Sequence, residues 1–256
     1  MKKLNLLAFT LLFTTSFAYA DIVSDLQTKK NNTQKTGISY TVVIPGEDED
    51  DSNKEYTVTE KGNSKSFEAP EYEQQHVILF SDNKLYQVPA LLKTEKNSPI
   101  PVIVLSGDAK FGVDEQIKEC KIPDYKDFKV VGKATVNGYQ CQVLLKTVSS
   151  QEIQEDKNDK FLSQESLKIY VIEKNGYPTR IEKVFTSKDM KGKVLHNEAK
   201  TAMDFVKFNT NLSGKILSLP KNAMVVDPLN KNMFDANAIK QQYLQKLHEQ
   251  YRDEEN

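Results

Sequence analysis

The prediction of the fold starts from Ser166-Leu-Lys-Ile-Tyr-Val-Ile172, a segment in which apolar and polar side chains alternate. A period of two residues is typical of a β-strand that buries one face. Asn175-Gly176 follows, a pair that readily supplies the positive φ angles of a two-residue hairpin turn. The chain returns through Pro178-Thr-Arg-Ile-Glu-Lys-Val-Phe185 to a second turn at Lys191-Gly192. The pattern predicts an antiparallel meander.

The end of this meander carries a resemblance to a known family. Met203-Asp-Phe-Val-Lys-Phe-Asn209 leads to Leu219-Pro220, and together with Tyr170, Asn175-Gly-Tyr-Pro178 and Gly192 this order resembles the C-terminal half of the LolA-type periplasmic lipoprotein carriers. The order is about equally similar to the wider LolA/LolB-like superfamily. The resemblance implies a mainly β (α+β) fold class, in which a curved antiparallel sheet forms a half-open β-barrel with a few lid helices. It also implies a periplasmic carrier or binder of lipid-modified cargo, which shelters acyl chains in an apolar cavity during outer-membrane lipoprotein sorting.

Residues 1–20 have the three parts of a secretory signal peptide. Lys2 and Lys3 form a basic start, an apolar segment follows, and Ala18-Tyr-Ala20 is a small-x-small cleavage site. The apolar segment is too short for a retained membrane anchor. We therefore expect export to the periplasm and cleavage after Ala20.

The exported chain is predicted to contain a LolA-like half-barrel domain over residues 21–226 and a C-terminal extension over residues 227–256. The extension has the signals of an amphipathic helix beginning at Asp235. Removal of Lys2 and Lys3 from the 35 basic residues leaves 33 against 36 acidic ones, a net charge of −3. No clustered basic surface for nucleic acid is expected from this balance.

The chain has two cysteines, Cys120 and Cys141. Because the leader predicts an oxidising compartment, the spacing favours a structural disulfide over two free thiols. Closing such a loop would stabilise the fold by about 3 kcal/mol through the unfolded state.

Helices are expected at three further places. Residues 21–34 read as a short amphipathic helix. Pro99–Leu105 is apolar and contains two prolines, which disfavour a central strand and suit the first turn of a helix. We expect a short helix there and another near Val113–Cys120, and in the carriers such a segment forms lid helices over the sheet.

The carriers are also thought to place an arginine on an early strand, where this chain has only Lys61 and Lys65.

Three further predictions concern the strands and the segments that connect them. Asn137-Gly138 predicts a second tight hairpin. Ser149–Ser163 is polar and charged and is interpreted as an exposed excursion between strands. Ala223–Val226 could add a last edge strand.

The predicted apolar cavity is lined by apolar residues from several of the predicted strands. For each of them, ordinary core packing is the simpler interpretation, and only the resemblance favours a ligand. The candidate lining residues are Tyr40, Val42, Tyr56, Val58, Leu79, Val143, Ile169, Val171 and Phe208. The candidate lid residues are Ile100, Val102, Ile103 and Leu105.

The sequence contains no motif that predicts catalysis. A Gly-x-Ser-x-Gly elbow, a phosphate-binding glycine loop and a His-Glu-x-x-His pair are absent. The acidic run at residues 47–51 fits a solvated hairpin tip better than a calcium loop. We expect no enzyme activity, no metal and no cofactor.

The expected partners are acyl chains of lipoproteins or other lipid, together with inner- and outer-membrane transfer proteins, and the chain is expected to be a monomer. The alternative is an envelope sensing or interaction module of the same fold, without lipid transport.

Overall fold

The structure, a computed structural model, describes residues 21–46, 51–69, 76–81, 84–89, 100–156 and 159–227. The predicted signal peptide, the C-terminal helix and most of the acidic run lie outside the described residues. The chain divides into two compact units. Among the described residues, unit 1 comprises residues 21–56 and Ile122–Leu212, and unit 2 comprises Thr57–Lys121 and residues 213–227.

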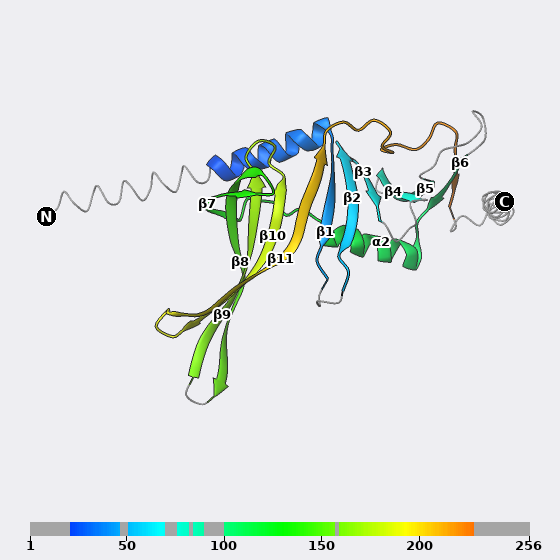
Figure 1. Cartoon of the computed structure of the whole chain (residues 1–256). Coiled ribbons are helices and arrows are strands. Elements are labelled where there is room, and N and C mark those ends of the chain that lie inside the picture. The colour runs from blue at the N-terminus through cyan, green and yellow to red at the C-terminus, as the bar shows by residue number, and fades with distance from the viewer. Residues whose placement is uncertain are drawn as a thin grey trace. The chain divides into compact units, whose positions relative to one another are not determined.

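Unit 1 is an antiparallel sheet (Figure 1). Its strands follow the order β1-β11-β10-β9-β8-β7, and each neighbouring pair runs antiparallel. The strands are β1 (Ile38–Ile44), β7 (Lys129–Val136), β8 (Tyr139–Asp156), β9 (Asp159–Ile172), β10 (Pro178–Asp189) and β11 (Val194–Asn209).

Unit 2 combines a sheet with helix α2 (Gly107–Glu119). The strand order is β12-β6-β5-β4-β3-β2, in which β6 and β12 are parallel and the other neighbouring strands are antiparallel. The strands are β2 (Lys54–Lys61), β3 (Ser64–Glu68), β4 (His76–Ser81), β5 (Lys84–Pro89), β6 (Ile100–Val104) and β12 (Ala223–Val226).

These elements confirm the mainly β fold class and its antiparallel sheet. Neither strand order returns to its own first strand, so the sheet of each unit is open. The edge strand expected at Ala223–Val226 is confirmed as β12. A helix near Val113–Cys120 is also confirmed, although α2 begins earlier, at Gly107.

The N-terminal helix, residues 21–36, lies across one end of the unit 1 strands (Figure 1). Val23 and Leu26 are its buried apolar residues. Hydrogen bonds attach it to the connection after β9 and to the segment before β7. For example, Thr33 Oγ1 donates to the carbonyl of Asn175 (3.0 Å), and Lys30 Nζ donates to the carbonyl of Pro123 (3.1 Å).

The two Asn-Gly turns have different outcomes. Asn137 (φ 51°) and Gly138 (φ 80°) form the predicted two-residue turn between β7 and β8. The two-residue turn predicted at Asn175-Gly176 is wrong, because β9 ends at Ile172 and β10 begins only at Pro178. Asn175 Oδ1 instead accepts a hydrogen bond from the amide of Tyr177 (2.9 Å), which shapes a longer connection.

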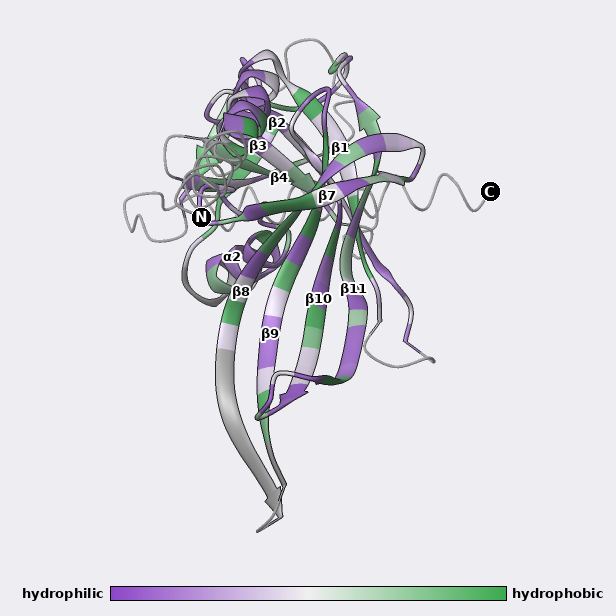
Figure 2. Cartoon of the chain, turned by 90° about the vertical axis from the view of Figure 1, so that its left-hand side faces the viewer, coloured by the Kyte–Doolittle hydropathy of each residue, from purple (hydrophilic) through white to green (hydrophobic). Residues whose placement is uncertain are grey.

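Ser149–Ser163 is not an excursion between strands. β8 continues to Asp156 and β9 begins at Asp159, so most of this polar segment is strand. Backbone pairing does not require an apolar face, and polar side chains can pair across strands. Figure 2 accordingly shows hydrophilic and hydrophobic bands mixed along β9, β10 and β11 toward the ends that lie away from the N-terminal helix.

The lid helix predicted at Pro99–Leu105 is wrong, because Ile100–Val104 is strand β6. The amide of Ile100 donates to the carbonyl of Asn222 beside β12 (3.0 Å). Successive amides of a strand point to opposite sides, so the nitrogen of Pro101 faces β5. The ladder to β5 pairs Val104 and Ile103 and does not reach Pro101, so the missing N–H of proline leaves no ladder bond broken.

The predicted disulfide is not formed. Cys120 and Cys141 are both free and buried. Cys120 follows the last turn of α2 in unit 2, whereas Cys141 packs among apolar side chains of unit 1. Burial raises the pKa of Cys120 to about 12 and the pKa of Cys141 to about 11. Protonated thiols are poor nucleophiles, so neither cysteine is suited to thiol chemistry at neutral pH.

Free, buried thiols predict a specific result in thiol titration. In denaturant without reductant, the chain is expected to expose both thiols to Ellman's reagent, whereas the folded chain at neutral pH reacts slowly. The pKa values of both thiols in the folded chain lie above the ordinary value of 9.0. Burial of the two protonated thiols therefore stabilises the fold fully below pH 9, and this stabilisation is lost as the pH rises toward 11 and 12. Absence of reactive thiols from the unreduced, unfolded chain would contradict the structure.

Candidate functional site

An apolar cluster on one face of β8 and β9 is the centre of the candidate site. Its buried members are Cys141, Val143, Tyr170 and Ile172. The β8–β9 register pairs Cys141 with Ile172 and Val143 with Tyr170, so all four side chains share one face of the sheet. Partly buried Ala134, Val136 and Phe208 pack against them. We call these seven residues the apolar cluster.

The cluster has an aromatic margin that solvent reaches. Tyr139, the first residue of β8, is 37% exposed. Its ring meets the ring of Phe208 edge-on, with the centroids 5.7 Å apart. The ring centre of Phe208 in turn lies 6.1 Å from that of Tyr40, which is buried. An apolar ligand could therefore reach the cluster along Tyr139 and Phe208.

The predicted lining residues are almost all buried, and they are divided between the two units. Buried in unit 1 are Tyr40, Val42, Tyr56, Val143, Ile169 and Val171, with Phe208 partly buried. Buried in unit 2 are Val58, Leu79, Ile100 and Val102, while Leu105 is partly buried and Ile103 is exposed. Leu79, Ile100 and Val102 belong to a second cluster, on which Ile216 and Leu219 also pack.

Strand register separates the predicted residues of unit 1. Val143 is opposite Tyr170, whereas Ile169 is opposite Leu144. Since neighbouring residues of a strand point to opposite faces, Val143 and Ile169 lie on opposite faces of the sheet. Of the predicted set, the structure gathers Val143 and Phe208 in the apolar cluster.

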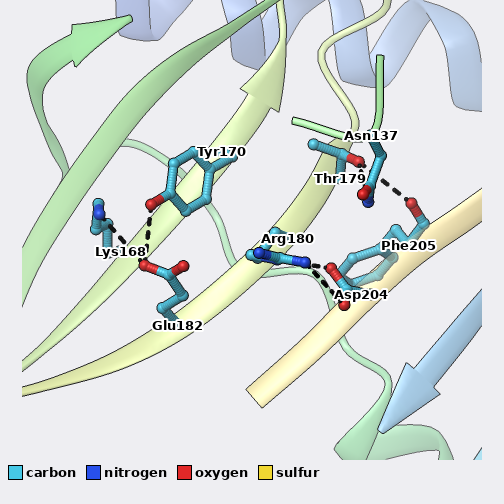
Figure 3. A network of polar contacts seen from close by, with 8 residues as sticks. All are labelled: Asn137, Lys168, Tyr170, Thr179, Arg180, Glu182, Asp204 and Phe205. Atoms are coloured by element: carbon cyan, nitrogen blue, oxygen red, sulfur yellow. Dashed lines mark hydrogen bonds and ion pairs between the residues drawn. The ribbon is translucent and has the colours of Figure 1, made fainter. Parts of the chain in front are cut away.

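Tyr170 connects the apolar cluster to a polar network (Figure 3). Its hydroxyl donates to Glu182 Oε2 (3.0 Å), and Lys168 Nζ lies 3.3 Å from the same oxygen. Lys168 Nζ also lies 4.8 Å from the centre of the Tyr170 ring. Burial works against a charge on Lys168, but the hydrogen bond with Tyr170 and the charge of Glu182 outweigh it and raise the pKa of Lys168. The network thus places a fixed cation and a fixed carboxylate beside apolar side chains.

Arg180 and Asp204 form the second part of the network, across β10 and β11 (Figure 3). Arg180 Nε donates to Asp204 Oδ1 (2.8 Å), and a terminal guanidinium nitrogen donates to Oδ2 (3.2 Å). Both side chains are partly buried. The hydrogen bond from Arg180 to Asp204 raises the pKa of the guanidinium above its ordinary value. Two parallel hydrogen bonds hold the two strands at one register.

Replacement of Arg180 by lysine is expected to destabilise the fold by about 1–2 kcal/mol, because lysine cannot make both hydrogen bonds. Urea unfolding of Arg180→Lys, Asp204→Asn and the double variant would measure the coupling. Lys207 and Glu55, an exposed pair 3.6 Å apart, are the control and should couple weakly. Equal coupling in the two pairs would contradict a special role for the Arg180–Asp204 pair.

These polar residues were not predicted from the sequence, because they belong to no catalytic or metal-binding motif. One signal was available: Arg180 and Arg252 are the only arginines in the sequence. Lys65, on the early strand β3, pairs with Glu60 at 2.5 Å. Among the described residues, no group of three or more His, Cys, Asp and Glu residues could hold a metal ion, and no helix is long and apolar enough to span a membrane.

Comparison with known proteins gives matches to solved structures at low sequence identity. No family model and no curated protein matches the sequence. The similar solved structures include a LolA superfamily protein from Nitrosomonas europaea, which has 14% identity, covers 77% of this chain and 94% of its own, and has a TM-score of 0.28. A putative outer-membrane lipoprotein-sorting domain from Vibrio parahaemolyticus has 12% identity, coverage of 80% and 95%, and a TM-score of 0.30. The MucA/MucB complex of Pseudomonas aeruginosa has 12% identity, coverage of 80% and 63%, and a TM-score of 0.33.

Proposed function

We propose that this chain is a periplasmic LolA-like binding module, which holds an acyl chain of lipid-modified cargo against the apolar cluster of unit 1. The observation that supports the proposal is the open margin at Tyr139 and Phe208, where buried apolar side chains continue into a partly exposed aromatic pair. Binding there requires no catalytic group, and the proposed role is that of a carrier rather than an enzyme.

The energetics favour such a role. Each methylene group that leaves water contributes about 0.8 kcal/mol, so a long acyl chain contributes roughly 10 kcal/mol. The polar head of the cargo would meet the Lys168–Glu182 pair, which borders the cluster through Tyr170. An amphiphile would therefore find both of its chemical halves matched on one face of the sheet.

The test is direct binding of a fluorescent fatty acid, together with native mass spectrometry of the chain purified from the envelope and analysis of the extracted lipid. Wild-type chain is expected to bind the probe and to retain acyl species. Tyr139→Ala and Phe208→Ala should weaken probe binding at least about tenfold, because they remove the aromatic margin. The matched control is Phe185→Ala, which removes an exposed ring from the second half of β10, toward its end at Asp189.

Probe binding that Phe185→Ala weakens as much as Phe208→Ala would contradict the proposed location. A protein that carries no lipid from the envelope and binds no probe would contradict acyl binding altogether. That outcome would favour the other function expected for this fold, a module that senses or binds an envelope protein. Co-purification of one protein at a fixed stoichiometry would then identify its partner.

A further inference from the structure

The end of the β10–β11 hairpin has a chemistry that the acyl site does not use. We call residues 188–195, Lys-Asp-Met-Lys-Gly-Lys-Val-Leu, the hairpin tip. It lies at the end of unit 1 opposite the N-terminal helix (Figure 1). The tip therefore belongs to a different surface from the connection after β9, to which that helix is bonded.

Asp189 holds the tip in one conformation. Its Oδ1 accepts hydrogen bonds from the amides of Lys191 (2.9 Å) and Lys193 (2.8 Å). The backbone of Asp189 makes two more bonds, from its amide to the carbonyl of Lys193 and from the amide of Gly192 to its carbonyl, both 2.9 Å. Gly192, at φ 85°, supplies the left-handed residue that the turn requires. The carboxylate is thereby directed into the turn.

Apolar side chains at the tip stand in solvent. Met190 is 56% exposed, Val194 51% and Leu195 57%. Leu195 falls between the paired residues Val194 and His196, at a shift in the β10–β11 register, so it has no direct partner on β10. Leu162 of β9, also exposed, is paired with Lys188 beside Val194. Single exposed apolar residues are ordinary, whereas three within this tip, with Leu162 on the adjacent strand, favour a contact surface.

The charges of the tip define the kind of surface that it fits. The tip has three positive charges, from Lys188, Lys191 and Lys193, and one negative charge, from Asp189. The whole chain, by contrast, has a net charge of −1. Lysine side chains can extend along an apolar surface and place their ammonium groups at its polar boundary. Apolar residues with lysines between them in the sequence match the boundary of an anionic bilayer, where acyl chains lie beneath negative headgroups.

We propose that the hairpin tip binds the surface of membranes that contain anionic phospholipid, with Met190, Val194 and Leu195 in the interfacial layer and the lysines among the headgroups. This contact does not depend on the proposed acyl site, which lies on other residues. It would hold unit 1 at the membrane by a rigid, preformed turn.

The absence of tryptophan from the sequence allows a sensitive test. A Met190→Trp variant of the exported chain contains one reporter, at the tip. With vesicles of phosphatidylethanolamine and phosphatidylglycerol, its emission should shift to shorter wavelength and be quenched by brominated lipid. The matched control is Val131→Trp on β7, which replaces a residue of similar exposure (54%) and should show neither effect.

Charge is tested by the double substitution Lys191→Gln and Lys193→Gln, made in the Met190→Trp variant. Because each lysine near an anionic surface contributes about a factor of five, the vesicle partition coefficient should fall roughly 25-fold. Lys129→Gln with Lys174→Gln removes the same charge elsewhere in unit 1 and should have a much smaller effect. Circular dichroism verifies that each variant folds.

Three outcomes would overturn the proposal. They are no spectral change with anionic vesicles, the same change in the Val131→Trp control, and equal partition into vesicles of phosphatidylcholine alone. Sedimentation in the absence of lipid examines the competing occupant, a second copy of the chain. If the tip substitutions abolish a dimer instead of membrane binding, the surface is a self-association site. The two proposals fail separately. Variants at Tyr139 or Phe208 should lose fatty-acid binding and keep membrane binding, whereas the tip variants should do the reverse.

Discussion

Gly176→Ala is expected to destabilise unit 1 by about 3 kcal/mol, through two effects that add. Gly176 has a φ angle of 74°, a left-handed conformation that costs a residue with a Cβ about 1–2 kcal/mol. A Cβ at this position would also meet the backbone of the N-terminal helix: the carbonyl oxygen of Leu26 and, at 2.5 Å, the amide nitrogen of Lys30. Overpacking against rigid backbone costs about 1–3 kcal/mol more.

The clash predicts where the damage appears. The carbonyl of Gly176 accepts a hydrogen bond from the buried hydroxyl of Tyr125 (3.0 Å), and the backbone amide of Tyr125 donates to Gln27 on the helix (3.1 Å). A shift of the helix therefore disturbs several contacts together. Hydrogen exchange should show lower protection over residues 21–36, and urea unfolding should give the loss in stability.

Gly138→Ala is the matched control for this experiment. Gly138 has a similar φ angle of 80°, but nothing lies within 4 Å of the Cβ that alanine would add. This variant should cost only the conformational part, about 1–2 kcal/mol, and leave helix protection unchanged. If the two alanine variants unfold at the same urea concentration, the close approach of helix and connection is wrong.

Tyr40→Ala is expected to destabilise the protein by about 3–5 kcal/mol, the range for truncating a large buried aromatic side chain. Tyr40 is 1% exposed, and its ring centre lies 5.5 Å from that of Tyr177, 5.9 Å from Phe205 and 6.1 Å from Phe208. Alanine would leave a cavity among three rings, and it would remove three aromatic contacts. Chemical denaturation monitored by far-ultraviolet circular dichroism measures the loss.

Tyr139→Ala provides the comparison, because Tyr139 also contacts Phe208 but is 37% exposed. Its loss should cost about 1 kcal/mol. The two tyrosines thus separate stability from binding: Tyr40→Ala should impair folding, whereas Tyr139→Ala should fold and bind a fatty acid less well. Similar stability losses in the two variants would show that Tyr40 is not part of a packed core.

Much of the fold was predictable because it depends on neighbours in the sequence. Alternation in residues 166–172 identifies β9, and the Asn137-Gly138 pair forms the turn between β7 and β8 because both residues accept positive φ angles. The N-terminal helix follows from its apolar spacing, and its buried Val23 and Leu26 agree with that spacing. In each case the local conformational preference and the final packing favour the same structure.

Other features depend on partners that are distant in the sequence. Pro101 occupies a strand because the ladder to β5 ends before it, and the sequence around Pro101 carries no record of that limit. Polar residues after Ser149 continue β8 because β9 pairs with them. The five-residue connection at Asn175-Gly176 follows the path of the N-terminal helix, which bonds to the carbonyl of Asn175.

The candidate site shows the same division. From the sequence alone came the mainly β class, the resemblance to LolA-type carriers and a set of apolar residues, since periodicity distinguishes buried from exposed positions within a strand. Only the tertiary structure decided which of them meet. Cross-strand register placed Val143 beside Tyr170 and turned Ile169 to the other face, and it set Arg180 opposite Asp204. Alternation defines two faces of each strand, but only pairing between strands determines which faces combine.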